Sequence, residues 1–283
     1  MNETTNQQLI RLKEENRRLE KQLEELNKKL LEAEAFKSHF ISNVTNEIVN
    51  PFASILGLSK SMMTAEEHQK EEVCHLAGLI YSEASFLDFQ LNNTFTAAKL
   101  EAGEVFVEVS PVELGQLMEE VLESVHPDQE RKQMNINFEL LPESPLYLHT
   151  DREKLKLILI NLISNGIKFS DNGKSVRITL KVSEKNLEIQ VADEGIGMDE
   201  KEVGKIFDRF HRADKRIHSL NPGNGLGLAV VDGLVHVLDG SVTVKSSPGK
   251  GSTFIVSLPE SLSESDFFDE DGLFAKDEEQ EFF

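Results

Sequence analysis

The segment NLISNGIKFS, residues 161–170, combines residue types and a spacing that could bind a phosphate ligand. Asn161, Asn165 and Lys168 lie four and three residues apart, so on a helix they share one face. Amide oxygens can ligate a hard cation such as Mg²⁺, and an ammonium group pairs with phosphate oxygens. Three polar residues on one helix face also suit a plain solvated surface, so this segment alone indicates only a candidate.

A second candidate closes an apolar stretch, in ADEGIGM at residues 192–198. Asp193 is followed by Gly195 and Gly197, which places a carboxylate acceptor beside backbone that a ligand can approach closely. A purine amino group is a natural donor to such a carboxylate. The same pattern also occurs in ordinary turns.

Two further segments combine aromatic, basic and glycine residues. In KIFDRFHRA, Phe207 and Phe210 stand beside Arg209 and Arg212; aromatics at this spacing are most often core residues, whereas an arginine suits a phosphate. NPGNGLGLAVV places three glycines before a helix, whose first amides can bind a phosphate. No Lys-Ser or Lys-Thr follows and no strand precedes, so neither a Walker loop nor a dinucleotide fingerprint is indicated. The residues of interest in that turn are Gly223, Gly225, Leu226 and Gly227.

The elements that must position these groups begin with a heptad repeat in residues 1–35. Leucines recur at spacings of three and four, with charged residues between them, which predicts a coiled coil. Asn16 at an a-type position favours a parallel two-stranded assembly and hence a homodimer. Extending the register places His39 and Asn46 at outward c positions.

Residues 36–102 read as a helical hairpin. A first helix passes Pro51, where a proline removes a backbone bond and kinks the helix. A second helix is expected at about 72–100 after a polar break. Doubled by dimerisation, the two helices predict an antiparallel four-helix bundle.

Residues 103–259 alternate between strand and helix patterns, which predicts a two-layer α/β sandwich. Helices are expected at 112–126, 151–169 and 225–238. The expected strands are 104–109, 134–141, 174–183, 186–193, 240–246 and 252–258.

Composition restricts the function classes. The net charge of −20 argues against nucleic acid or an anionic membrane surface as the main partner. The single cysteine, Cys74, excludes an intramolecular disulfide framework and a cysteine-rich metal site. Without a signal peptide or a spanning segment, we expect a cytoplasmic protein. Residues 260–283 read as an acidic disordered tail, whose phenylalanines either dock on a partner or are merely solvated.

The four segments, in this order and spacing, resemble the nucleotide domain of sensor histidine kinases. FKSHFISNVTNEIVNPFASILGLSKSM, residues 36–62, is similar to the dimerisation and phosphoacceptor segment of the same family. The resemblance covers residues 36–258. It implies the ATPase fold that histidine kinases share with gyrase-like and chaperone ATPases, with ATP and Mg²⁺ as ligands and a response regulator receiver domain as partner.

The resemblance also assigns roles to individual residues. Asn165 would hold Mg²⁺ against the ATP phosphates, with Asn161 and Lys168 nearby, and Asp193 would accept the adenine amino group. Arg212 would reach the γ-phosphate. The set is completed by Phe169, Gly195, Gly197, Gly223, Gly225, Leu226 and Gly227. Of these, Gly223, Gly225 and Gly227 would form the far end of a lid over the triphosphate.

Two positions depart from related patterns. ATP-hydrolysing members of the wider superfamily carry a glutamate base where this chain has Asn161, and an amide is no useful base near neutral pH. The phosphoacceptor histidine of the kinases is replaced by Asn46, whose amide nitrogen is not a nucleophile. Glu47, the neighbouring base, would then have nothing to deprotonate. We therefore expect ATP binding without autophosphorylation at this position.

Three functions stay open at this point. Glu47-Ile48-Val49-Asn50 matches the pattern with which some members dephosphorylate their response regulator, because an amide at Asn50 can orient water. Alternatively, the chain is an active kinase whose acceptor histidine was substituted or lies in a partner chain. His39 lacks an adjacent acid and reads as a surface residue rather than a relocated acceptor. The third alternative is a dimeric scaffold without catalytic function.

Overall fold

A computed structural model of the chain describes residues 2–64, 70–142, 146–183, 186–211 and 225–261. For residues 2–10, 28–47, 64 and 70 it describes the helical backbone only. The chain divides into two compact units, residues 1–50 and residues 51–283, and each is considered by itself.

The first unit consists of most of one long helix, α1 (Asn2–Thr64), which continues through Pro51 into the second unit. Four leucines of the predicted heptad seam are 54% to 71% exposed in the single chain: Leu12, Leu19, Leu23 and Leu26. Exposed leucines at heptad spacing are typical of a coiled-coil strand. The parallel dimer and the four-helix bundle remain predictions. The second hairpin helix, α2 (Lys70–Ala102), matches the expected position.

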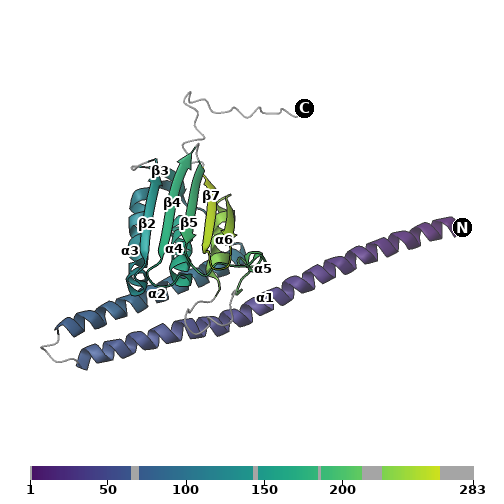
Figure 1. Cartoon of the computed structure of the whole chain (residues 1–283). Helices are drawn as coiled ribbons and strands as arrows, with labels where there is room; N and C mark the ends of the chain where they lie inside the picture. Colours follow the sequence, from purple (N-terminus) through teal and green to yellow (C-terminus); the bar gives the residue numbers. More distant parts are fainter. Residues whose placement is uncertain (1, 65–69, 143–145, 184–185, 212–224, 262–283) are drawn as a thin grey trace, which may run out of the picture. The chain divides into compact units, whose positions relative to one another are not determined.

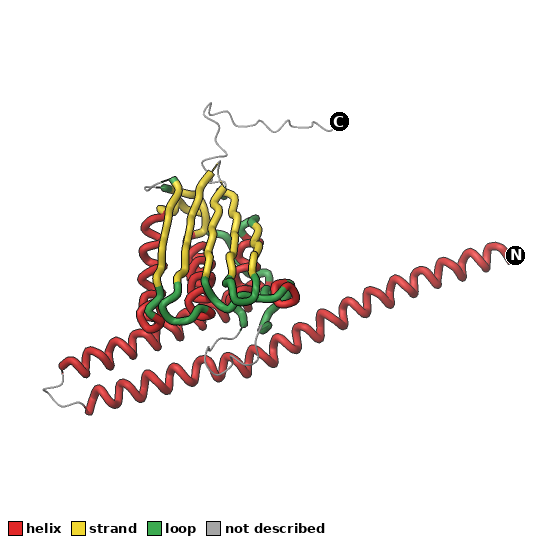
Figure 2. Tube along the Cα trace, viewed as in Figure 1, coloured by secondary structure: helices red, strands yellow, loops and turns green. Residues whose placement is uncertain are grey.

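The second unit contains a sheet with helices packed on one face (Figures 1 and 2). Five strands lie in the order β2-β4-β5-β7-β6, with β2 and β4 parallel and the other neighbours antiparallel. The strands are β2 (Asn135–Leu141), β4 (Ser175–Ser183), β5 (Asn186–Asp193), β6 (Ser241–Ser246) and β7 (Ser252–Pro259). The covering helices are α3 (Leu114–Lys132), α4 (Arg152–Phe169) and α6 (Gly227–Val237). The predicted two-layer α/β architecture is confirmed.

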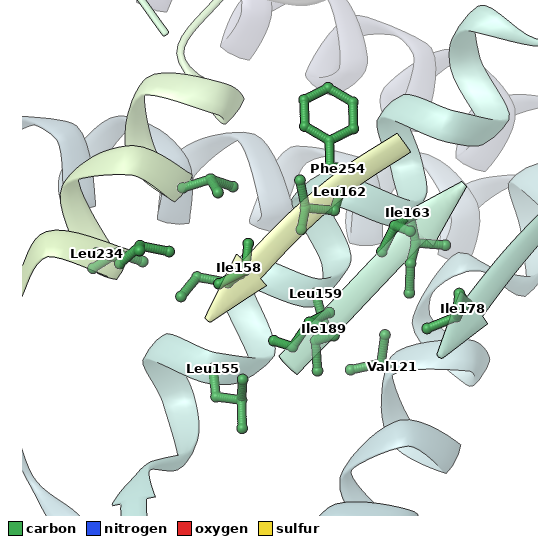
Figure 3. Close-up of a cluster of buried hydrophobic side chains, with 14 of the residues drawn as sticks. Val121, Leu155, Ile158, Leu159, Leu162, Ile163, Ile178, Ile189, Leu234 and Phe254 are labelled. Carbon is green, nitrogen blue, oxygen red and sulfur yellow. The ribbon is translucent and has the colours of Figure 1, made fainter. Parts of the chain in front are cut away.

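The hydrophobic core lies between this sheet and its helices, and α4 is its central helix (Figure 3). Helix α4 buries apolar residues at the 3-4 spacing of one helix face: Leu155, Ile158, Leu159, Leu162 and Ile163. They lie among side chains from the other elements, including Val121, Ile178, Ile189, Leu234 and Phe254. Full burial of each such side chain contributes roughly 1.5–3 kcal/mol, so the core holds α4 firmly in place.

Two sequence predictions about elements were wrong. No strand forms at 104–108; the strand begins only at residue 109, as β1 (Val109–Glu113), which pairs antiparallel with the unpredicted β3 (Tyr147–Asp151). Phe106 is 80% exposed, because an alternating pattern forms a strand only where a partner strand is available. Helix α3 was expected to end at residue 126, yet it runs through Pro127 to Lys132 and ends where Gln133 adopts a left-handed conformation with φ of 52°.

The predicted tail begins with two residues that the structure still describes. Ser261 donates its backbone N–H to the carbonyl of His149 at 2.8 Å, and the His149 ring lies 3.0 Å from the Glu260 carboxylate. These two residues therefore bind to β3. Residues 262–283 lie outside the described residues. In the part of the chain that the structure describes, no helix has the length and apolar character needed to cross a membrane.

Candidate functional site

Helix α4 carries the predicted asparagine and lysine positions, and its first turn is anchored by Asp151. The Asp151 carboxylate accepts from the backbone N–H of Lys154 at 3.0 Å and from that of Glu108 at 2.8 Å. The Lys154 ammonium lies 2.5 Å from the same carboxylate. Burial raises the pKa of Asp151, but these hydrogen bonds and the lysine charge outweigh it, so the pKa is lowered. Asp151 is thus an ionised N-cap in a buried site.

The three polar positions of α4 differ in burial. Asn161 is 3% exposed and its amide donates to Asn93 of α2, whereas Asn165 and Lys168 are half-buried. Within the described residues, the Asn165 side chain has no hydrogen-bond partner. The Lys168 ammonium lies 5.3 Å from the centre of the Phe169 ring, and Phe169 is 37% exposed. The alternative interpretation of the three residues as a solvated helix surface is therefore wrong for Asn161, which is buried.

The C-terminal end of α4 is held by Lys132, a residue that sequence reasoning missed. Its ammonium donates to the carbonyls of Ile167, Lys168 and Ser170 at 3.0, 2.6 and 2.9 Å. Burial lowers the pKa of Lys132, whereas three carbonyl dipoles favour its charged form. No local pattern could have identified this contact, because Lys132 precedes Ile167 by 35 residues.

The turn after β5 is built around the Asp193 carboxylate. Its Oδ1 atom accepts from the backbone N–H groups of Gly195 at 2.8 Å and Ser252 at 3.1 Å. A Cβ added at Gly195 would lie 2.6 Å from the carbonyl oxygen of Phe169. Only glycine fits between the end of α4 and this turn, so the predicted Asn helix and Asp-Gly turn are neighbours in space.

The second carboxylate oxygen of Asp193, Oδ2, differs from Oδ1 in its hydrogen bonding. Within the described part of the chain, Oδ2 accepts no hydrogen bond. Burial raises the pKa of Asp193, and the two backbone hydrogen bonds act in the opposite direction. A half-buried carboxylate with one oxygen committed and the other available is suited to accept from a ligand N–H group.

The other glycines of the turn support the backbone itself. A Cβ added at Gly197, whose φ is +64°, would lie 1.9 Å from the Ser247 carbonyl oxygen. Gly251 has φ of +79°, and its Cβ would lie 1.9 Å from the carbonyl oxygen of Asp193. Gly251 and Ser252 were missed as site residues. Their signal was the segment PGKGS at 248–252, between two predicted strands.

The glycine-rich turn reaches the same end of α4. Gly227 begins α6, and a Cβ there would lie 2.5 Å from Asn161 Oδ1. Phe210 donates its backbone N–H to the Gly225 carbonyl at 3.0 Å. Leu226 is 1% exposed, so its side chain belongs to the core and only its backbone can face a ligand. Gly227 at the start of α6 therefore lies beside Asn161, and the N-cap residue Leu226 makes no side-chain cap bond to the first amides.

The remaining predicted residues are placed as follows. Phe207 and Phe210 pack against the core, which confirms the core interpretation of that aromatic pair. Arg212 and Gly223 lie outside the described residues. Asn46 and Glu47 lie within α1, but their side chains lie outside the described residues, as does the predicted outward orientation of Asn46. Asn50 is exposed on α1.

Most of this domain matches one family of proteins. Residues 150–262 match the family described as Histidine kinase-, DNA gyrase B-, and HSP90-like ATPase. The sensor histidine kinase GacS of Pseudomonas protegens is 32% identical over 241 residues, which cover 84% of this chain and 26% of GacS. The Escherichia coli sensor histidine kinase RcsC is 29% identical over 242 residues, which cover 86% of this chain and 25% of RcsC.

Solved structures agree on the fold. Full-length ShkA in complex with AMPPNP matches with a TM-score of 0.56 at 23% identity, covering 80% of this chain and 46% of ShkA. The Acinetobacter baumannii histidine kinase AdeS matches with a TM-score of 0.52 at 19% identity, covering 76% of this chain and 97% of AdeS.

Together, the domain and these relatives define the class. Residues 150–262 form an ATPase domain of the histidine kinase, gyrase and HSP90 type. The chain belongs to the sensor histidine kinase family and carries its two-component catalytic core. It spans about a quarter of the length of the curated relatives that it matches.

Proposed function

We propose that the chain binds Mg-ATP between the C-terminal half of α4, the Asp193 turn and the first turn of α6. The observation that carries the proposal is the Asp193 carboxylate, which keeps Oδ2 available while Oδ1 holds Gly195 and Ser252. An adenine amino group would donate to Oδ2. The membership of the domain in an ATPase family supports the same ligand.

The donor chemistry around Asn165 fits a magnesium ion. Mg²⁺ prefers oxygen ligands, and Asn165 has an amide that is half-buried and without a hydrogen-bond partner in the described residues. Asn161 directs its oxygen toward Gly227, where the absence of a Cβ leaves close access. When bound, Mg²⁺ would neutralise phosphate charge. Lys168 and Phe169 would adjoin the nucleotide.

The glycine-rich turn would complete the phosphate site. We assign Gly223, Gly225 and Gly227 to the far end of the lid, with Arg212 directed at the γ-phosphate. The first amides of α6 would be phosphate donors, because the N-cap residue Leu226 has no side-chain acceptor for them. Gly195 and Gly197 allow the close backbone contacts of the Asp193 turn, against which the adenine would lie.

Binding would not lead to hydrolysis or to phosphorylation of the usual acceptor position. Asn161 cannot act as a base, and its amide donors are already bound to Asn93 and Leu157. Asn46 cannot attack the γ-phosphate, because its nitrogen lone pair is delocalised into the carbonyl. The proposed function is therefore that of an ATP-binding homodimer that controls a response regulator or a partner kinase.

The proposed organisation follows the predicted segments. Residues 1–35 form the coiled coil, 36–102 the dimerisation hairpin, 103–259 the ATP-binding domain and 260–283 the acidic tail. The exposure of Asn50 supports a phosphatase function, in which Glu47 and Asn50 orient water toward a receiver aspartyl phosphate. An active kinase that uses a histidine elsewhere and a nucleotide-free scaffold are the competing functions.

The nucleotide site is tested by Asp193→Asn. An asparagine oxygen can still accept from Gly195 and Ser252, but its NH₂ group replaces the acceptor that adenine needs. We expect calorimetric affinity for a non-hydrolysable ATP analogue to fall about 100-fold, with a thermal unfolding temperature no lower than that of the unaltered protein. Asp128→Asn is the matched control, because Asp128 is a partly exposed carboxylate on α3 that pairs with Arg131. Equal affinity in all three proteins would exclude the proposed site, and no binding even by the unaltered protein would favour the scaffold.

The missing acceptor is tested by incubation with Mg²⁺ and γ-labelled ATP. The native protein should carry no acid-labile label, whereas Asn46→His should gain it if the rest of the phosphotransfer machinery is intact. Strong labelling of the native protein would show an active kinase with another acceptor. Release of phosphate from a phosphorylated receiver domain, compared between native and Asn50→Ala proteins, tests the phosphatase function.

A further inference from the structure

The C-terminal half of α2 is part of the wall of the ATPase domain. Three polar residues and Ala97 on this stretch are buried: Gln90, Asn93 and Thr94 are 8%, 2% and 5% exposed. A Cβ added at Gly233 of α6 would lie 2.7 Å from Leu100 Cδ1. Glu101, the residue after Leu100, forms an ion pair with Arg209. This stretch of the predicted dimerisation hairpin therefore packs against α6, and it reaches Asn161 in the middle of α4.

Within this contact, two buried amides form a hydrogen-bond chain with a defined direction. Asn93 donates from Nδ2 to the carbonyl of Phe89 at 3.1 Å, so its Oδ1 remains as an acceptor. Asn161 donates to that Oδ1 at 2.7 Å and to the carbonyl of Leu157 at 2.9 Å. Both nitrogen assignments follow because a backbone carbonyl can only accept.

These hydrogen bonds determine where the Asn161 oxygen lies. Because both donors of Nδ2 are used, Oδ1 must lie on the opposite side of the amide, where Gly227 begins α6. Asn161 and Asn93 are 3% and 2% exposed, and a hydrogen bond is stronger in such a low-dielectric interior. A flip of the Asn161 amide would place its oxygen against two other acceptors, Asn93 Oδ1 and the Leu157 carbonyl, and is therefore unfavourable.

We propose that Asn93 of α2 is a positioning residue for the nucleotide site: it holds the Asn161 amide so that its oxygen is available to the magnesium ion that binds the phosphates. The inference rests on the proposed Mg-ATP site. It also explains the amide at position 161, since a glutamate there would present a carboxylate to two acceptors, Asn93 Oδ1 and the Leu157 carbonyl.

The coupling is reciprocal. If α2 in place improves Mg-nucleotide binding, then Mg-nucleotide must stabilise the packing of α2 by the same factor. The hairpin helix would thereby respond to nucleotide occupancy without any phosphoryl transfer. That property suits a protein whose acceptor position is Asn46.

Asn93→Ala tests the proposal through three binding measurements. We expect the affinity for AMP-PNP with Mg²⁺ to fall about 10-fold, with little change for AMP-PNP in EDTA or for adenosine. Asn92→Ala is the matched control, because the neighbouring Asn92 is exposed and its side chain donates to Asp88 on its own helix. Unchanged or tighter Mg-AMP-PNP binding, or an equal loss for adenosine, would overturn the proposal.

A second measurement uses the unaltered protein and does not depend on the variant folding. Hydrogen exchange of residues 90–101 should slow with Mg-AMP-PNP and not with adenosine at saturation. Equal exchange in both states would overturn the positioning role of Asn93. Absence of all nucleotide binding would instead overturn the proposed function itself, so the two failures are distinguishable.

Discussion

The two ends of helix α4 are held by opposite charges that reach them by different routes. At the N-terminal end, the Asp151 carboxylate accepts from Lys154 N–H at 3.0 Å. At the C-terminal end, the Lys132 ammonium donates to the carbonyls of Ile167, Lys168 and Ser170. Both arrangements complement the helix dipole, which is positive at the first turn and negative at the last.

The difference between the two ends is one of sequence distance. Asp151 lies three residues from the amide that it caps, so its contact forms as soon as the helix does. Lys132 belongs to α3 and reaches α4 across 35 residues, so its contact exists only after the domain has folded. The end of α4 that adjoins the proposed nucleotide site is therefore the end that tertiary structure holds.

The largest expected effect on stability is at the N-terminal end of α4. Asp151→Ala removes the cap, leaves the Glu108 N–H without its acceptor and leaves Lys154 without its partner. We expect a loss of about 3 kcal/mol in the free energy of unfolding, measured with urea. Asp199→Ala removes an exposed cap of the short helix α5 (Glu200–Val203) and should cost about 1 kcal/mol or less. Equal losses would show that the buried network around Asp151 adds nothing to simple capping.

Lys132→Met tests the opposite end. The three carbonyls lose a charged donor, and we expect about 2 kcal/mol of destabilisation together with weaker ATP-analogue binding, because the Phe169 turn loses its anchor. Arg131→Met is the control, since the neighbouring Arg131 forms an exposed pair with Asp128 and should change stability by less than about 0.5 kcal/mol. A Lys132 variant with full stability and affinity would show that α4 positions its last turn unaided.

Asp193→Asn should stabilise the ligand-free protein slightly. Because burial raises the pKa of Asp193 above its ordinary 3.8, the folded state binds the proton more tightly than the unfolded chain. Stability therefore falls as pH rises from about 3.8 through the folded pKa, and an amide avoids that loss. We therefore expect a gain in the free energy of unfolding at pH 7 that disappears below pH 3.8. The reverse pH dependence in urea titrations would contradict the raised pKa.

The smallest expected effect lies on the surface near the Asp151 end. Hydrogen bonds from Arg152 and Lys156 lower the pKa of Glu120 from 4.5 to about 2, so its stabilising contribution is present above pH 4.5 and is lost as pH falls toward 2. Because the pair is 34% exposed, Glu120→Gln should cost less than about 1 kcal/mol at pH 7. Glu119→Gln, at the adjacent exposed position, should have no effect. Acid unfolding curves at low and high salt provide the measurement.

Most elements with strong periodicity could be predicted from the sequence. The apolar spacing of α4 and the alternation in β4, β5 and β7 each report a face that one partner layer buries. The strand predicted at 104–109 was wrong because its alternation met no partner strand, and β3 was missed because pairing with β1 decides it. The sequence motifs identified Asp193, Gly195 and Gly227 as site residues. Gly251, Ser252 and Lys132 lie outside these motifs, and only the structure shows that they contact the site.

By itself, the sequence determined which residues carry chemistry. The amide at Asn46, the carboxylate at Asp193 and the Asn161–Asn165 spacing are covalent facts, and they specify what can attack, accept or ligate. Only the tertiary structure decided how these groups are held. The Asn161 oxygen is oriented by Asn93, 68 residues away, and the last turn of α4 is held by Lys132. Such contacts depend on the packing of distant helices, which no local pattern of residues contains.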